Sequence, residues 1–212
     1  MITFPSKQPF VATTIFTKMS QMASDEGALN LAQGFPSFDC SDELQDLVKF
    51  YAKGHNQYAP MAGVPVLKSS IAAKTESFYG ISLDANTEVT VVSGATEAIF
   101  ASIHCCVFPG DEVIMFDPSY DAYDPIVRLA GGIPIHISLK ASNGYRIDWD
   151  ELARKITPKT KAIMVNSPHN PTGSIWNPSD LDAFAEIIKG TQILIVSDEV
   201  YEHIVFDGAS HA

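Results

Sequence analysis

From about residue 88 onward, short apolar runs rich in β-branched residues alternate with longer segments of helical periodicity. Most of the short runs are apolar at consecutive positions, which is typical of strands buried on both faces. Alternation of such strands with helices predicts an α/β fold in which a mostly parallel sheet is flanked by helices. The predicted strands are 89–92, 112–116, 133–138, 161–166 and 192–197, and the predicted helices between them are 95–107, 120–130, 149–155 and 179–189.

The residues before this region lack that alternation. A short helix is predicted at 14–24, a Gly/Pro turn at 33–36, and two further helices at 42–53 and 64–79. We therefore expect the N-terminal part to be an arm with helices, ahead of the sheet.

Composition excludes several classes of function. The chain has 14 Lys and Arg against 25 Asp and Glu, a net charge of −11, and its basic residues do not cluster, so we expect no nucleic-acid partner. No apolar run approaches the roughly 20 residues that a membrane-spanning helix needs. Residues 1–11 have no continuous apolar core and do not resemble a signal peptide. These features predict a soluble cytoplasmic protein.

The cysteines agree with that compartment. There are three, Cys40, Cys105 and Cys106, and two of them are adjacent within a predicted helix. An odd number arranged in this way does not form a disulfide framework, and no His or Cys partner stands at metal-ligand spacing. We expect no metal site and interpret the cysteines as structural core residues.

In parallel sheets, ligands bind at the carboxyl ends of the strands, so polar residues there are candidates for function. After the first run, Ser93 is a good N-cap and Gly94 allows a bend into a helix. The unpaired N–H groups of that helix, with the hydroxyls of Ser93 and Thr96, can hold a phosphate. An ordinary capped helix is the alternative.

Three further strand ends carry candidates. Tyr120 can stack on a flat ring, whereas for Tyr123 packing between helices is the simpler interpretation. Asn170 is fixed in a tight turn by prolines and can offer its amide to a ligand oxygen or cap its own backbone. Asp198 follows an apolar run, where a carboxylate needs a cationic or donor partner, and Tyr201 can point to the same place. A structural Asp–Tyr pair is the alternative.

Together these groups match the needs of pyridoxal 5′-phosphate (PLP). A carboxylate keeps the pyridine nitrogen protonated, so that the ring accepts electrons from the substrate. An amide and a phenol can hydrogen-bond the 3′ oxygen, and a helix N-terminus can bind the phosphate.

The same segments resemble the class I/II aminotransferases, PLP enzymes of fold type I, nearly from end to end. The matching motifs are Ser93-Gly94-Ala95-Thr96-Glu97-Ala98, Asn170-Pro171-Thr172-Gly173 and Ser197-Asp198-Glu199-Val200-Tyr201. Residues 30–36, 56–60 and 201–204 look like the branch that contains methionine aminotransferase and kynurenine–oxoglutarate aminotransferase. The resemblance implies an arm of the small domain at 1–41 and the N-terminal part of the large PLP-binding domain at 42–212.

The resemblance also implies residue roles. Ala95 and Thr96 would bind the phosphate, Tyr120 would stack on the ring, Asn170 and Tyr201 would hold the 3′ oxygen, and Asp198 would pair with the pyridine nitrogen. Gly34 would lie beside the substrate carboxylate, with Phe35 near the side-chain pocket. Tyr58 would reach the phosphate of the neighbouring subunit, which implies a homodimer with shared active sites.

The sequence departs from the family in one respect. The Schiff-base lysine, usually in a Ser-x-x-Lys segment beyond the tyrosine matched by Tyr201, has no counterpart in these 212 residues, so no catalytic residue is assigned. We expect a fragment of an aminotransferase that exchanges an amino group between an amino acid and a 2-oxo acid, inactive by itself. A PLP-dependent C–S β-lyase shares every motif, and a non-catalytic binding remnant is the third possibility.

Overall fold

The computed structural model describes residues 5–9, 11 and 13–211. The described residues divide into two compact units, one within residues 13–92 and the other formed by residues 93–211 with residues 5–9 and 11. Residues 1–4 and 10 of the segment 1–11, for which the sequence predicted no signal peptide, lie outside the described residues. The boundary expected at residue 41 stays a prediction, and the two units are described separately below.

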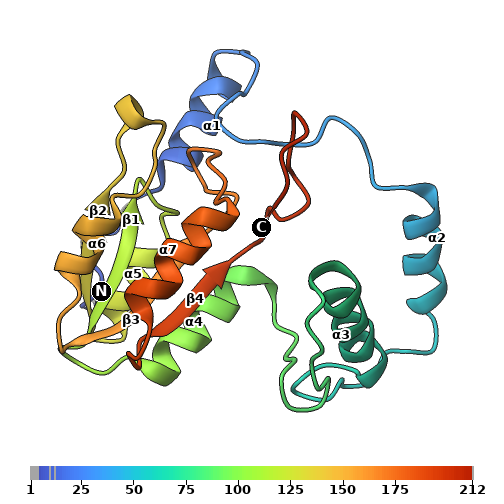
Figure 1. Ribbon diagram of the computed structural model, residues 1–212. Helices are drawn as coiled ribbons and strands as arrows, with labels where there is room; N and C mark the ends of the chain where they lie inside the picture. Colours follow the sequence, from blue (N-terminus) through green and yellow to red (C-terminus); the bar gives the residue numbers. More distant parts are fainter. Residues whose placement is uncertain (1–4, 10, 12, 212) are drawn as a thin grey trace. The chain divides into compact units, whose positions relative to one another are not determined.

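The second unit is built on a four-stranded sheet (Figure 1). Its strands are β1 (Glu112–Asp117), β2 (Ile133–Ser138), β3 (Thr160–Asn166) and β4 (Leu194–Asp198), in the order β2-β1-β3-β4. All three pairings are parallel. The α/β fold with a parallel sheet is therefore confirmed, and these four strands lie within two residues of their predicted ends.

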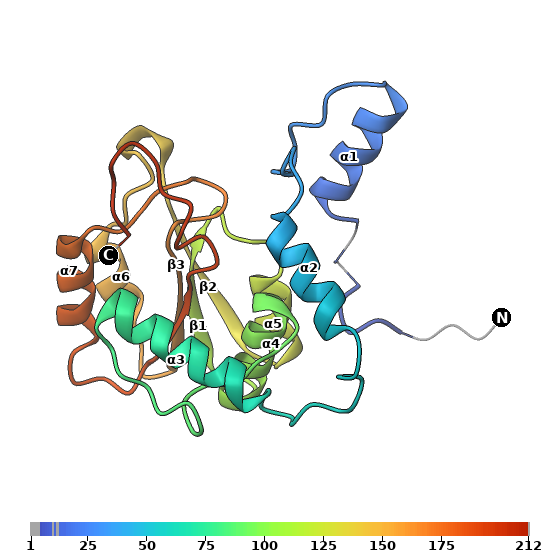
Figure 2. The same cartoon turned by 90° about the vertical axis from the view of Figure 1, so that its right-hand side faces the viewer.

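Helices cover both faces of this sheet, as Figure 2 shows. α4 (Gly94–Cys106) and α5 (Tyr123–Leu129) pack on one face, and α6 (Trp149–Lys155) and α7 (Pro178–Ile188) pack on the other. Alternate residues of β1 serve the two cores: Val113 and Met115 face α4 and α5, while Ile114 and Phe116 face α6 and α7. Burial on both faces explains why these strands are apolar at consecutive positions.

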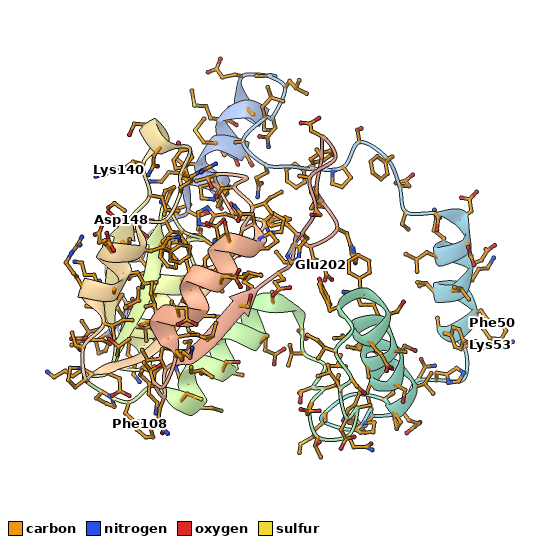
Figure 3. The ribbon with its side chains drawn as sticks, viewed as in Figure 1. Phe50, Lys53, Phe108, Lys140, Asp148 and Glu202 are labelled. Atoms are coloured by element: carbon orange, nitrogen blue, oxygen red, sulfur yellow. The ribbon has the colours of Figure 1, made fainter. Side chains whose placement is uncertain are left out.

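Because the strands are parallel, all their amino ends lie at one edge of the sheet and all their carboxyl ends at the opposite edge. In Figure 3, Phe108, which precedes β1, marks the amino edge, and Lys140, which follows β2, marks the carboxyl edge. Asp148, also labelled there, caps α6 by accepting the N–H of Glu151 at 2.9 Å. A short 3-10 helix, η1 (Ala141–Asn143), lies between β2 and α6. The carboxyl edge is thus the place to look for the predicted ligand groups.

The predicted strand 89–92 is wrong, because this segment has no regular secondary structure. Its residues belong to the first unit, where the N–H of Val91 donates to the carbonyl of Ala62 at 3.0 Å. Val89 is nevertheless buried, so the apolar character of the run is used for packing. A strand also needs a neighbouring strand for its backbone groups, and here a loop satisfies one of them.

Two smaller expectations also need correction. The helix predicted at 120–130 begins at Tyr123, because residues 120–122 form a turn in which the carbonyl of Tyr120 accepts the N–H of Tyr123 at 3.1 Å. The cysteines are not core residues: Cys40 and Cys105 are exposed and Cys106 is half-buried. In α4, the residues that are buried against the sheet are Ile99 and Ile103, and Cys105 and Cys106 follow them at the end of the helix.

The first unit contains α1 (Ile15–Asp25), α2 (Asp42–Tyr51) and α3 (Pro65–Tyr79), close to the three predicted helices. Thr14 and Ser41 cap α1 and α2 with their side chains, and Pro65 begins α3. Among the described residues, no helix is long and apolar enough to cross a membrane.

Candidate functional site

A cavity of about 230 Å³ opens at the carboxyl edge of the sheet, between α4 and the ends of β3 and β4. It is lined by all six of the cofactor-binding residues predicted in this unit, namely Ala95, Thr96, Tyr120, Asn170, Asp198 and Tyr201. Tyr123 and Asn166, which were not predicted as site residues, line it as well. The sequence-based grouping of these strand-end residues is therefore matched by their spatial proximity.

The N-terminus of α4 forms one side of this cavity. Gly94 begins the helix with a φ of +83°, a conformation that other residues rarely adopt. Ser93 occupies the N-cap position, but its side chain makes no capping hydrogen bond; instead the Glu97 carboxylate accepts the backbone N–H of Ser93. The first N–H groups of a 13-residue helix and the Thr96 hydroxyl thus remain available for an anion in the cavity.

Asp198, the last residue of β4, provides the carboxylate. Its Oδ2 accepts a hydrogen bond of 2.6 Å from the Tyr123 hydroxyl, and its Oδ1 accepts the N–H of Val200 at 3.2 Å. Burial, followed by the hydrogen bond to Asp198, raises the pKa of the Tyr123 phenol well above its ordinary value. The phenol therefore stays protonated and acts as a donor to the Asp198 carboxylate.

Asn166, the last residue of β3, joins the ends of the neighbouring strands β3 and β4. Its side-chain amide donates to the backbone carbonyl of Asp198 at 2.7 Å, and its side-chain oxygen accepts the N–H of Asn170 at 2.7 Å. Asn166 is only 5% exposed. It was missed by sequence reasoning, although a polar residue that ends an apolar run is the same signal that identified Asp198.

The aromatic groups and the turn complete this side of the cavity. The Tyr120 and Tyr123 rings meet edge to face with centroids 5.7 Å apart, and Tyr201 lies in the turn that follows β4. His169 is buried, and its Nδ1 lies 2.7 Å from the Thr172 hydroxyl within the Asn170 turn. Burial lowers the pKa of His169, whose ring takes part in the hydrogen bonding of this turn.

Three predicted residues belong to the first unit. The side chain of Tyr58 is fully exposed, that of Phe35 is 66% exposed, and an added Cβ at Gly34 would meet nothing within 4 Å. Asn30, in the same segment as Gly34, is held near α1 by a hydrogen bond of 3.0 Å to Ser20. The roles expected for Gly34, Phe35 and Tyr58 stay predictions.

The fold and this site define the class of protein. The family model for aminotransferase class I and II matches residues 26–212, and the chain belongs to that family. Aminotransferases of these classes are PLP-dependent, as the sequence motifs indicated.

Particular relatives support the branch as well as the family. The chain is 48% identical over 208 residues to methionine aminotransferase of Escherichia coli K12, covering 98% of the chain and 54% of that protein. It is 35% identical over 226 residues to kynurenine–oxoglutarate transaminase of Dictyostelium discoideum, covering 98% of the chain and 52% of that protein. The chain thus spans about half the length of the curated relatives it matches.

Solved structures that are similar to this chain are also aminotransferases. An Escherichia coli structure whose reactivity identifies a methionine aminotransferase superposes with a TM-score of 0.95 at 46% identity, covering 100% of this chain and 56% of that one. N-succinyldiaminopimelate aminotransferase of Mycobacterium tuberculosis gives a TM-score of 0.92 at 43% identity, covering 99% of this chain and 55% of that one.

The residues that line the cavity fit the non-covalent binding of PLP. An anion-binding helix end and a carboxylate line the same space, as a phosphate and a protonated pyridine nitrogen require. The Asn170 amide and the Tyr120 and Tyr201 rings line it too, and they can serve the remaining oxygen and the flat face of the ring.

Proposed function

We propose that this protein is a PLP-dependent aminotransferase that moves an amino group from an apolar or aromatic amino acid, such as methionine or kynurenine, to a 2-oxo acid. The observation that carries the proposal is the shared cavity, in which the N-terminus of α4 and the Asp198 carboxylate are lining groups. Methionine and kynurenine are the substrates that the names of similar proteins suggest.

Each residue has a role that its environment permits. The N–H groups at Ala95 and Thr96 bind the phosphate dianion, helped by the positive end of α4. Asp198, held in place by donors to both of its oxygens, keeps a proton on the pyridine nitrogen. The protonated ring of PLP supplies an electron sink for the α-carbon of the substrate.

The other cavity residues orient the ring. Tyr120 stacks on one face, while Asn170 and Tyr201 hydrogen-bond the 3′ oxygen. In the first unit, Gly34 and Phe35 contact the amino-acid substrate, and Tyr58 reaches the phosphate of a second subunit. The role of Tyr58 implies a homodimer with shared active sites, and we propose that this homodimer is cytoplasmic.

The 212 residues contain no counterpart of the Schiff-base lysine of the family. No Ser-x-x-Lys segment is present in the sequence, and no lysine lines the cavity in the part of the chain that the structure describes. We therefore expect the 212 residues alone to transaminate no faster than free PLP. Measurable turnover with any amino donor would contradict this expectation.

The first test is binding of PLP by the apo form of the full-length protein. Trp149 and Trp176 pack together in the sheet-bearing unit, with ring centroids 5.4 Å apart, so quenching of their fluorescence can report the titration. Asp198→Asn should weaken PLP binding about 10- to 100-fold, because it removes a charged hydrogen-bond partner. Asp182→Asn, on an exposed position of α7, is the matched control. Equal affinity in the two variants would overturn the proposed site.

The second test separates the reaction types. Full-length protein with PLP is incubated with methionine and a 2-oxo acid, and the products are identified. Formation of the oxo acid of methionine and the amino acid of the acceptor supports transamination. Release of thiol, pyruvate and ammonia from an S-substituted cysteine, offered in a separate incubation without an acceptor, would instead indicate a C–S β-lyase.

A further inference from the structure

Tyr123 is placed to control Asp198 from outside the strands. It is the first residue of α5, 75 positions before Asp198 in the sequence, and its hydroxyl donates to Oδ2 of that carboxylate at 2.6 Å. Only 3% of Tyr123 is exposed, because its ring packs in the core between α4, α5 and the sheet. A rigid aromatic side chain therefore presents a single donor to a carboxylate at the edge of the cavity.

This donor leaves room for a ligand. An ionised carboxylate has about four lone-pair sites, and the hydrogen bonds from Tyr123 and Val200 occupy two of them. They fall on different oxygens, so together they fix both the position and the plane of the carboxylate. The remaining sites on Asp198 can accept a ligand N–H without rotation of the side chain.

The Tyr123 ring has a second contact with the site. Its edge-to-face packing with Tyr120, at an interplanar angle of 76°, supports the aromatic residue that the proposed function assigns to ring stacking. Tyr123 thus contacts both Asp198, the proposed partner of the pyridine nitrogen, and Tyr120, which is proposed to stack on the pyridine ring. Nothing in the sequence motifs assigns it either role.

We propose that Tyr123 is a positioning residue that acts through Asp198: its hydroxyl aims the carboxylate at the pyridine nitrogen of PLP. This inference rests on the proposed function. The raised pKa of the phenol agrees with it, since a phenol that stays protonated keeps its O–H as a donor to the carboxylate. A tyrosine with a purely structural role would stabilise the fold, and its hydroxyl would not affect the binding of PLP differently from that of an analogue without the ring nitrogen.

The test compares two ligands on the apo form of the full-length protein. One is PLP, and the other is 1-deazapyridoxal 5′-phosphate, in which a C–H replaces the ring nitrogen. Tyr123→Phe deletes only the hydroxyl and keeps the ring that contacts Tyr120. We expect this variant to bind PLP about tenfold more weakly, the effect of losing a hydrogen bond to a charged group, and to bind the deaza analogue within about twofold of wild type.

Two further variants keep the result interpretable. Tyr145→Phe, which removes the hydroxyl of a half-buried tyrosine elsewhere in the same unit, should bind both ligands like wild type. In an Asp198→Asn background, Tyr123→Phe should cause no further selective loss of PLP affinity, because the partner through which it acts is already changed.

The outcomes separate the inference from the function. Equal weakening of both ligands by Tyr123→Phe, or no weakening of either, would overturn the positioning role while leaving PLP binding by the wild-type protein intact. Failure of the wild-type protein to bind PLP would overturn the proposed function and, with it, this inference. A change in the circular dichroism of the Tyr123→Phe apoprotein would assign the hydroxyl to the fold and also contradict the inference.

Discussion

Replacing Asn166 by Ala should destabilise the sheet-bearing unit through one specific buried group. The substitution removes two hydrogen bonds of 2.7 Å, one to the carbonyl of Asp198 and one from the N–H of Asn170. The Asp198 carbonyl keeps the N–H of Ser167 at 3.3 Å, so the group left without its partner is the Asn170 N–H. An unsatisfied buried donor costs about 1–3 kcal/mol and a lost hydrogen bond about 1 kcal/mol, so we expect a loss of about 2–4 kcal/mol.

A second variant removes the hydrogen bond to the Asp198 carbonyl and keeps the one from the Asn170 N–H. Asn166→Asp keeps an acceptor for the Asn170 N–H but replaces the donor to Asp198 by a carboxylate oxygen. We expect it to bind PLP more weakly than Asn166→Ala does, because it adds a negative charge that repels the Asp198 carbonyl and carboxylate.

The assay is equilibrium urea unfolding followed by tryptophan fluorescence, since Trp149 and Trp176 both lie in the affected unit. Asn143→Ala is the matched control: its amide makes one exposed hydrogen bond of 3.3 Å to the carbonyl of Arg146, and its loss should cost less than about 1 kcal/mol. If Asn166→Ala were no more destabilising than the control, the view that Asn166 ties the two strand ends together would be refuted.

Two further predictions concern the same unit. Gly94→Ala should lower the free energy of unfolding by about 1–2 kcal/mol in the same urea experiment, because the φ of Gly94 is +83°, although an added Cβ would meet nothing within 4 Å. Asn143→Ala serves again as the control, and an equal effect of the two substitutions would contradict this prediction. Burial would raise the pKa of Asp124, but hydrogen bonds from Arg128 and His136 prevail and hold it below its usual value of 3.8. Stabilisation by this carboxylate is therefore present above about pH 4 and is lost as the pH falls through the lowered pKa. In urea unfolding at a series of pH values, Arg128→Gln should cost at most about 1 kcal/mol at neutral pH and converge with wild type in acid; a constant difference would contradict the assignment.

The two central strands, β1 and β3, were predicted from a sequence pattern that reflects burial on both faces. Residues 113–116 and 162–165 are consecutively apolar because alternate side chains enter two different cores. Residues 89–92 have a similar, mostly apolar sequence but form no strand. Such a sequence indicates that a segment is buried, but it does not indicate that a neighbouring strand is present. The hydrogen-bond partner of such a segment is set by tertiary structure, which a local pattern does not contain.

The candidate site shows a similar division. Asp198, Asn170 and Tyr120 could be predicted because each follows a strand and none suits an apolar core. Tyr123 was interpreted as a packing residue, and it does pack in the core, but its hydroxyl also reaches Asp198. Its dual role depends on a contact between residues 75 positions apart, which spacing along the chain does not reveal.

Strand register connects the fold to this site more directly than any single motif does. In the β3–β4 pairing, Asn166 lies opposite Asp198, and this register is set by the apolar residues that precede both of them. A slip of one residue would place Val165 opposite Asp198 and would also turn the buried side chains of β3 toward the wrong core. The same apolar pattern that pairs the strands therefore brings the Asn166 amide to the Asp198 carbonyl and the Asn170 turn to the cavity. Because the core residues enforce that register, substitutions at Ile163 or Val165 should disturb the site as well as the stability of the sheet.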